Sequence, residues 1–182
     1  AFSRDSIVVK VEAPGAPDLT LIDLPGIVRT ATAGQDPAVI GQVNSLVESF
    51  LQQERTVVLA VVPANQDVAT IDILERARGV DPEGVRTLGV LTKPDLVGPG
   101  SESEVMSVLR NERKPLKLGY VMVKCRSQRD LDRGVTPRQA RVDEAKFFSE
   151  HPDWGQVTRP ILGVQKLTER LTKLLVERIH KG

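Results

Sequence analysis

The sequence predicts an α/β fold: a mostly parallel β-sheet with helices on both faces. Three observations carry this prediction. Short runs rich in β-branched residues alternate along the chain with stretches of helical apolar spacing. The runs are apolar at successive positions, which is typical of strands covered on both faces. Turn signals separate the elements, at Pro25-Gly26, Asp81-Pro82 and Gly98-Pro99-Gly100.

The elements can be placed in order along the chain. The expected strands are residues 6–12, 19–24, 56–63, 86–92 and 120–125. The expected helices are residues 38–53, 69–79, 101–115, 137–149 and 164–180. The last helix has apolar residues on one face, as an amphipathic helix requires, at Leu167, Leu171, Leu174, Leu175 and Ile179.

The composition fits one soluble globular domain with an aliphatic core. The 182 residues are 40% apolar, 27% charged and only 3% aromatic. The formal net charge of +1, with acids and bases interspersed, argues against a nucleic-acid-binding surface. The single cysteine, Cys125, excludes an intramolecular disulfide and indicates a reducing compartment. The most apolar run, residues 56–64, is too short to span a bilayer.

Polar residues follow three of the expected strands. Ligands of open α/β sheets bind beyond the carboxyl ends of the strands, so all three sequences would project onto one edge. They are Asp23-Leu24-Pro25-Gly26, Thr92-Lys93-Pro94-Asp95 and Lys124-Cys125-Arg126-Ser127-Gln128.

The first sequence is suited to a phosphate and a metal ion. Asp23 could hold a magnesium-bound water, and the backbone N–H of Gly26 could approach a terminal phosphate because glycine has no side chain. The alternative is an ordinary turn after a strand, with a solvated aspartate.

The second sequence is suited to guanine. Asp95 could accept hydrogen bonds from N1–H and the exocyclic amine, a donor pair that adenine lacks. The Lys93 stem could lie over the purine, and Pro94 would stiffen the loop. The alternative is an aspartate that caps the following turn.

The third sequence is less specific. Arg126 could stack on the base, and Ser127 and Gln128 could offer hydrogen bonds. Cys125 is interpreted as a small buried residue rather than a nucleophile, because no histidine lies near it in the sequence. The order of the three sequences, with about seventy residues from Asp23 to the second, is nevertheless the layout of a guanine-nucleotide site.

Long stretches of the chain resemble the GTPase domain of the dynamin superfamily, and within it the interferon-induced Mx proteins. They are LTLIDLPGI, VVPANQDVAT, VDPEGVRTLGVLTKPDLV, GYVMVKCRSQ and FFSEHP. Dynamins typically have Leu where Pro94 stands and Asn-Arg-Ser-Gln at the third site. Pro94 and the Lys-Cys-Arg sequence resemble Mx, while Ser127-Gln128 is also similar to dynamins. The stretch between Pro152 and Pro160 is shorter than in the family.

The resemblance implies a P-loop-type GTPase fold and a role for each matching residue. Asp67 would contact the nucleotide of a partner GTPase domain, although it could also cap the helix that follows. Asp23 would hold Mg²⁺ through water. The implied GTP-binding residues are Asp23, Leu24, Pro25, Gly26, Ile27, Thr92, Lys93, Pro94, Asp95, Cys125, Arg126 and Gln128.

The resemblance also implies an organisation and partners. Residues 1–160 would form a partial GTPase domain, and residues 161–182 a helix of the bundle signalling element. The cofactors would be GTP and Mg²⁺. The protein would form homo-oligomers and serve antiviral defence or membrane remodelling, with contacts to viral nucleoprotein, membrane or microtubules and no direct contact to nucleic acid. It would be cytoplasmic or nuclear.

One family motif is missing from the sequence. A phosphate-binding loop needs G-x-x-x-x-G-K-[ST], but no lysine here is followed by Ser or Thr. In the family, the strand carrying this loop lies between the strands that end at Asp23 and near Pro63, and both are expected to lose a neighbour. The chain starts at Ala1 without methionine, so we expect it to be truncated and to hydrolyse GTP negligibly by itself; no catalytic residue is assigned. A truncated relative acting as a non-catalytic binding module is the alternative.

Overall fold

The structure of the chain is a computed structural model, which describes residues 5–14, 19–26, 38–67 and 72–179. The chain divides into two compact units, residues 1–56 and 57–182, and each is described by itself. The first unit contains one helix, α1 (Ala38–Leu51), among its described residues, and the face of α1 carrying Val43, Val47 and Leu51 is buried.

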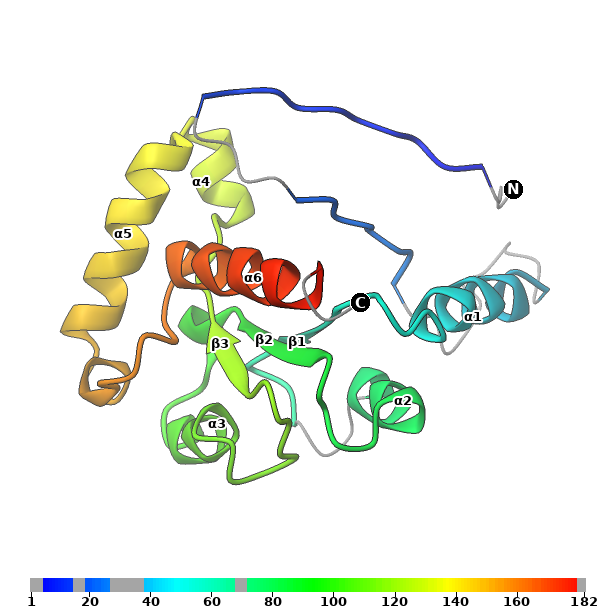
Figure 1. The fold of residues 1–182 in the computed structure, drawn as a ribbon. Helices are drawn as coiled ribbons and strands as arrows, with labels where there is room; N and C mark the ends of the chain where they lie inside the picture. The colour runs from blue at the N-terminus through cyan, green and yellow to red at the C-terminus, as the bar shows by residue number, and fades with distance from the viewer. Residues whose placement is uncertain (1–4, 15–18, 27–37, 68–71, 180–182) are drawn as a thin grey trace. The chain divides into compact units, whose positions relative to one another are not determined.

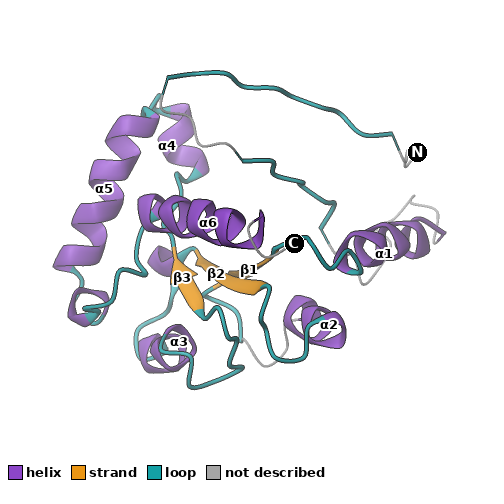
Figure 2. Cartoon of the chain, viewed as in Figure 1, coloured by secondary structure: helices purple, strands orange, loops and turns teal. Residues whose placement is uncertain are grey.

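The second unit is an α/β arrangement, as Figures 1 and 2 show. Its strands are β1 (Val58–Pro63), β2 (Thr87–Thr92) and β3 (Tyr120–Met122). Its α-helices are α2 (Asp72–Val80), α3 (Glu102–Leu109), α4 (Gln128–Asp132), α5 (Pro137–Glu150) and α6 (Val164–Ile179). Two short 3₁₀ helices are η2 (Pro94–Leu96) and η3 (Trp154–Gln156).

The three strands form a parallel sheet in the order β1-β2-β3. Pro63 is in register with Thr92, and Leu91 is in register with Met122. The carboxyl ends of all three strands therefore lie at one edge, where a doubly covered parallel sheet binds its ligands.

Helices cover both faces of this sheet (Figure 1). On one face Val62, Leu91 and Met122 pack with residues of α2, α3, α5 and η3. On the other face Val90 and Val121 pack with α6. Both faces pack against apolar side chains, aliphatic on the α6 face and including Tyr120, Phe148 and Trp154 on the other, which explains the continuous apolar runs and confirms the predicted fold class. Among the described residues, no helix is long and apolar enough to cross a membrane.

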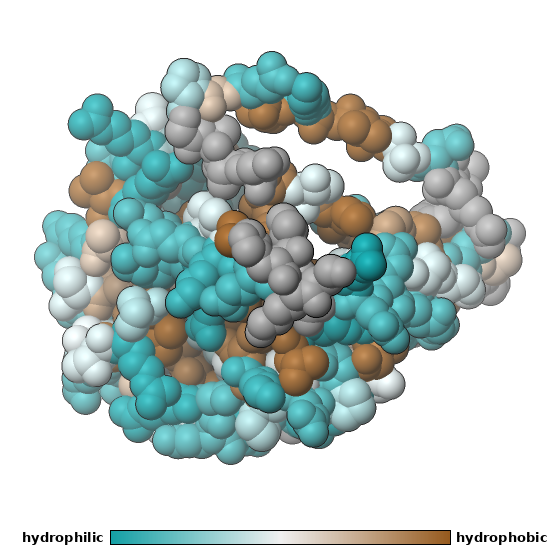
Figure 3. All heavy atoms as spheres, viewed as in Figure 1, coloured by the Kyte–Doolittle hydropathy of each residue, from teal (hydrophilic) through white to brown (hydrophobic). Residues whose placement is uncertain are grey.

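The strands expected at residues 6–12 and 19–24 are wrong. Residues 5–14 and 19–26 belong to no strand among the described residues, and Ile7 is 94% exposed. Figure 3 shows the apolar residues of segment 5–14 as a brown run on the surface. A β-branched sequence favours extended backbone, but a strand forms only when a neighbour pairs with its N–H and C=O groups.

The helix expected at residues 101–115 ends earlier, at Leu109. Asn111 follows with a positive φ of 68°. Its side chain donates to the carbonyl of Leu116 and accepts from the amide of Leu116, both at 2.9 Å. This closed turn replaces the last helical turn, which is a typical use of asparagine outside helices.

The short helix α4 was not expected from the sequence. Its start is a capping box, in which the Ser127 side chain accepts from the Asp130 amide and the Asp130 side chain accepts from the Ser127 amide. The Ser-x-x-Asp spacing is a local signal that would have identified this helix start.

Candidate nucleotide site

The loop after β2 presents Asp95 at the carboxyl edge of the sheet. The Thr92 hydroxyl donates to the carbonyl of Val62 at 3.4 Å, which holds the end of β2 against β1. Lys93 has a φ of 56°, in the left-handed region, so the backbone turns away from the strand at this residue. Its side chain is exposed. Pro94 is buried as the first residue of η2, so the following Asp95 is fixed by a rigid turn while remaining exposed.

The loop after β3 leaves the same edge next to β2. The amide of Val123 donates to the carbonyl of Leu91 at 2.8 Å, so pairing continues one residue beyond the strand. The next amide, that of Lys124, donates to the Glu144 carboxylate at 2.8 Å. The Lys124 ammonium lies 5.6 Å from the centre of the Phe147 ring, where a cation is attracted to the aromatic face.

Two residues expected to frame the base hold the loop itself. The Arg126 guanidinium donates to the carbonyl of Val135 at 2.8 Å, and Gln128 donates to Asp132 at 2.9 Å. Arg126 keeps further N–H donors, because a guanidinium has five. The Gln128 side chain therefore donates a hydrogen bond within α4, and not to a group at the edge of the sheet.

The two loops leave neighbouring strands, because β2 and β3 are paired up to the amide of Val123. The expectation that Cys125 is buried is wrong, because the residue is exposed where the loop leaves the sheet. Partial desolvation still raises the pKa of its thiol, and the carboxylates of Glu144 and Asp95 raise it further. Lys124 lowers it by a smaller amount. Asp95, from the β2 loop, thus lies near Cys125, from the β3 loop, and the thiol stays neutral at pH 7. The structure brings the second and third predicted sequences together.

The first predicted sequence lies in the other unit. Asp23, Pro25 and Gly26 are exposed, and Leu24 is partly exposed. Nothing lies within 4 Å of a Cβ placed on Gly26, which leaves its backbone open to a close ligand. Ile27 lies outside the described residues.

Asp67 belongs to the second unit. It is exposed, shortly after β1 ends at Pro63. The helix expected at residues 69–79 begins at Asp72 in the structure, and residues 68–71 lie outside the described part, so neither role of Asp67 is tested.

One group of described side chains has the composition of a metal site. Glu102, His151 and Asp153 each offer a ligand atom, and these atoms lie within 4.8 Å of one another. However, His151 Nδ1 accepts from the amides of Asp153 and Trp154, at 3.2 and 3.4 Å. The lone pair on Nδ1 is therefore already used, and we assign no metal to this group.

Glu144 is the residue that the sequence interpretation missed. It is 5% exposed, and its carboxylate bonds the β3 loop as well as the amide of Val164 at 2.9 Å. The sequence could have indicated it, because an acid on the inner face of an amphipathic helix is usually bonded to a fixed partner. Which backbone amides it meets could not be read from the sequence.

These features place the chain among the α/β proteins that have a candidate ligand site at the carboxyl edge of a parallel sheet. The chain has an α/β fold whose parallel strands end in two adjoining loops, and one loop carries an acceptor carboxylate beside a long cationic stem. The fit to GTP can be judged at the base end, where an exposed carboxylate on a rigid turn suits the two donors of guanine.

Comparisons with known proteins identify the family. The sequence pattern described as "Dynamin family" matches residues 1–94, and that described as "Dynamin central region" matches residues 104–182. The chain therefore belongs to the dynamin family.

The similar relatives carry Mx names. "Interferon-induced GTP-binding protein MxE" of Danio rerio is 46% identical over 182 residues, covering 100% of this chain and 29% of the relative. "Interferon-induced GTP-binding protein Mx2" of Mus musculus is 46% identical over 188 residues, covering 100% of this chain and 28% of the relative. "Interferon-induced GTP-binding protein Mx" of Perca fluviatilis is 44% identical over 185 residues, covering 98% of this chain and 60% of the relative. The chain thus spans less than two thirds of the relatives that it matches.

Proposed function

We propose that the chain is part of a GTP-binding and GTP-hydrolysing large GTPase of the Mx type, and that its β2 and β3 loops read the guanine base. The observation that carries this proposal is the position of Asp95, on a rigid turn at the carboxyl edge of the sheet and next to the loop of Cys125. The GTP-binding names of the relatives support it.

The base would be recognised by complementary hydrogen bonding. The Asp95 carboxylate accepts from N1–H and the exocyclic amine of guanine. An adenine in the same place presents no such pair, so it leaves the carboxylate without a partner. The Lys93 stem covers one side of the purine, and the residues after β3 bound its edge.

The phosphate end rests on the family resemblance. In this proposal Gly26 offers its amide to the terminal phosphate, Asp23 holds Mg²⁺ through water, and Asp67 reaches the nucleotide of a second copy. Self-assembly follows from this last contact. An antiviral role, a cytoplasmic or nuclear location, and contacts with viral nucleoprotein, membranes or microtubules are further parts of the proposal.

The test compares guanine and adenine nucleotides. GDP and ADP binding would be measured by calorimetry on this chain and on a version extended through its own upstream gene sequence. Asp95→Asn should weaken GDP binding about tenfold or more without weakening ADP binding, because it replaces one acceptor by a donor. Asp143→Asn on α5 is the matched control, because its carboxylate is exposed and accepts from Gln139 on the same helix at 2.8 Å.

Equal GDP and ADP affinity in both versions would refute the proposed base recognition. Turnover separates the enzyme from the alternative, a non-catalytic binding module. This sequence does not contain the G-x-x-x-x-G-K-[ST] motif. GTP hydrolysis by the extended version alone would support the enzyme and the need for that motif.

A further inference from the structure

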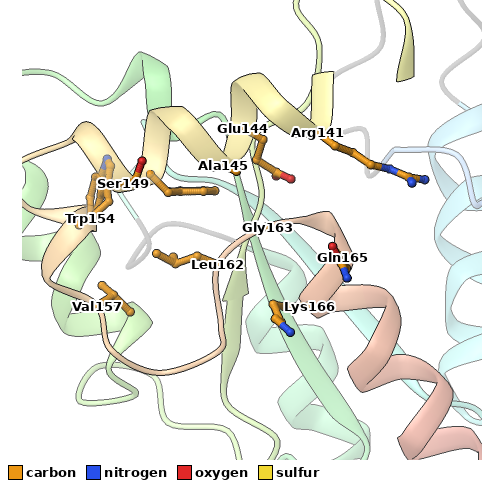
Figure 4. Close-up of a pocket in the computed structure, with 12 residues that line it drawn as sticks. Arg141, Glu144, Ala145, Ser149, Trp154, Val157, Leu162, Gly163, Gln165 and Lys166 are labelled. Atoms are coloured by element: carbon orange, nitrogen blue, oxygen red, sulfur yellow. The ribbon is translucent and has the colours of Figure 1, made fainter. Parts of the chain in front are cut away.

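The β3 loop and the start of α6 are bonded to one buried carboxylate. Glu144 Oε1 accepts from the Lys124 amide at 2.8 Å, and Glu144 Oε2 accepts from the Val164 amide at 2.9 Å. Lys124 begins the loop after β3, and Val164 is the first residue of α6. Figure 4 shows Glu144 reaching from α5 toward the turn at Gly163.

The turn before α6 is shaped to admit this carboxylate. Gly163 has a φ of 96°, and a Cβ at this position would lie 3.3 Å from Glu144 Oε2. The Gly163 amide donates to the carbonyl of Met122 at 2.8 Å, and the Met122 amide donates to the carbonyl of Ile161 at 2.9 Å. The segment before α6 therefore runs beside the end of β3, and both are held next to Glu144.

Hydrogen bonds to two backbone amides orient the buried Glu144 side chain. A cavity of about 310 Å³ flanks it, lined also by Trp154, Leu162 and Lys166 (Figure 4). Among the described residues, no salt bridge to Glu144 is found. A buried carboxylate that loses its hydrogen-bond donors is costly, so the two backbone amides are held firmly in place.

We propose that Glu144 is a positioning residue for guanine recognition, which fixes the loop of Cys125 and Arg126 to the first turn of α6. This inference rests on the proposed function, because it concerns the loop that bounds the base. It adds a consequence for α6: a displacement of this helix moves the Val164 amide, which shares the Glu144 carboxylate with the base loop. Guanine affinity therefore depends on where α6 begins.

The first test follows the two amides directly. In Glu144→Gln one oxygen becomes an NH₂ group, which cannot accept from an amide. Hydrogen exchange, measured by NMR on the whole chain, should accelerate about tenfold or more at Lys124, Val164 or both. The Gly89 amide, which donates to Gly119 in the sheet at 3.0 Å, should keep its rate. Asp143→Asn removes the same charge one residue away and should change none of these rates.

A second variant distinguishes the effect of side-chain length from the effect of charge. Glu144→Asp keeps the carboxylate but is one methylene shorter, so it cannot reach both amides from α5. It should accelerate exchange as Glu144→Gln does. Exchange rates at both amides equal to those of the unaltered chain, in either variant, would overturn the proposal. A uniform acceleration that includes Gly89 would also overturn it, because it would show a loss of overall stability only.

Nucleotide binding supplies the functional measurement. Glu144→Gln should weaken GDP binding about fivefold or more and leave ADP binding unchanged, whereas Asp143→Asn should alter neither. Unchanged GDP affinity in Glu144→Gln, with accelerated exchange at Lys124, would refute the role in guanine recognition. If the unaltered chain and its extended version showed no GDP preference, the proposed function would fail. The exchange pattern would still decide whether Glu144 holds the loop.

Discussion

Replacing Asp81 by asparagine should destabilise the second unit by about 2–4 kcal/mol. Asp81 is 4% exposed and lies just before β2. Its Oδ1 accepts from the Val85 amide at 2.9 Å, while Oδ2 accepts from the Arg86 amide at 3.0 Å and the Thr87 hydroxyl at 2.6 Å. This carboxylate therefore fixes the entry of the strand whose other end carries Asp95.

The magnitude follows from these hydrogen bonds. Asparagine keeps one oxygen, so it can replace Oδ2 or Oδ1 but not both. One backbone amide at this buried site is then opposed by an NH₂ group, at a cost of about 1–3 kcal/mol. The bonds that remain are to a neutral acceptor, and weakening them adds about 1 kcal/mol.

The assay is urea unfolding of the unaltered chain, Asp81→Asn and Glu83→Gln, followed by circular dichroism. Glu83 is exposed and lies in the same turn, so Glu83→Gln removes one negative charge without removing these bonds. Its unfolding free energy should stay within about 0.5 kcal/mol of the unaltered chain. A loss below about 1 kcal/mol for Asp81→Asn would refute the assigned role of the carboxylate.

The same carboxylate predicts a dependence on pH. Burial by itself raises the pKa of Asp81, but the Thr87 hydroxyl, the Arg86 and Val85 amides and the Arg86 charge outweigh it and lower the pKa overall. A lowered pKa contributes stability above the unfolded value of about 3.9, and this contribution is lost as pH falls through the folded value. The difference in unfolding free energy between the unaltered chain and Asp81→Asn should therefore be constant near neutral pH and shrink below about pH 4.

Two further predictions concern glycines. A Cβ on Gly89 would overlap the Tyr120 ring of the neighbouring strand, so Gly89→Ala should lower the unfolding free energy by about 3 kcal/mol; a loss below about 1 kcal/mol would show that the ring can move aside. Gly163→Ala places a side chain at a φ of 96° and against Glu144, and it should lower the unfolding free energy by about 2 kcal/mol. Gly41→Ala on α1, where nothing lies within 4 Å of the added Cβ, is the control for both and should not destabilise the chain.

Much of the local structure could be predicted from the sequence. The strands expected at residues 56–63 and 86–92 begin within two residues of β1 and β2 and end with them. The helix expected at residues 137–149 differs from α5 by one residue at its end. These segments have a hydrophobic period that matches their final environment, so local pattern and tertiary packing agree. The predicted guanine motif could be located for the same reason, because it begins at Thr92, the last residue of β2.

The pattern at residues 6–12 and 19–24 was equally clear, yet these segments form no strand among the described residues. Helical hydrogen bonds are made within one segment, whereas the hydrogen bonds of a strand belong to two. Sequence pattern therefore specifies a helix more completely than a strand. The pattern identifies extended apolar segments, but it does not show which of them pair with another strand.

The sequence by itself determined the fold class and the membership of the dynamin family. It also predicted which residues would meet guanine. Only the tertiary structure decided that the loops of Asp95 and Cys125 adjoin, and that Glu144 holds the second of them to α6. The physical reason lies in the kind of contact. Periodicity and turn chemistry depend on residues that are close in the chain, whereas a buried carboxylate meets whichever backbone amides the packed sheet and helices bring to it. Lys124 and Val164 each lie 20 residues from Glu144, and no local pattern joins them.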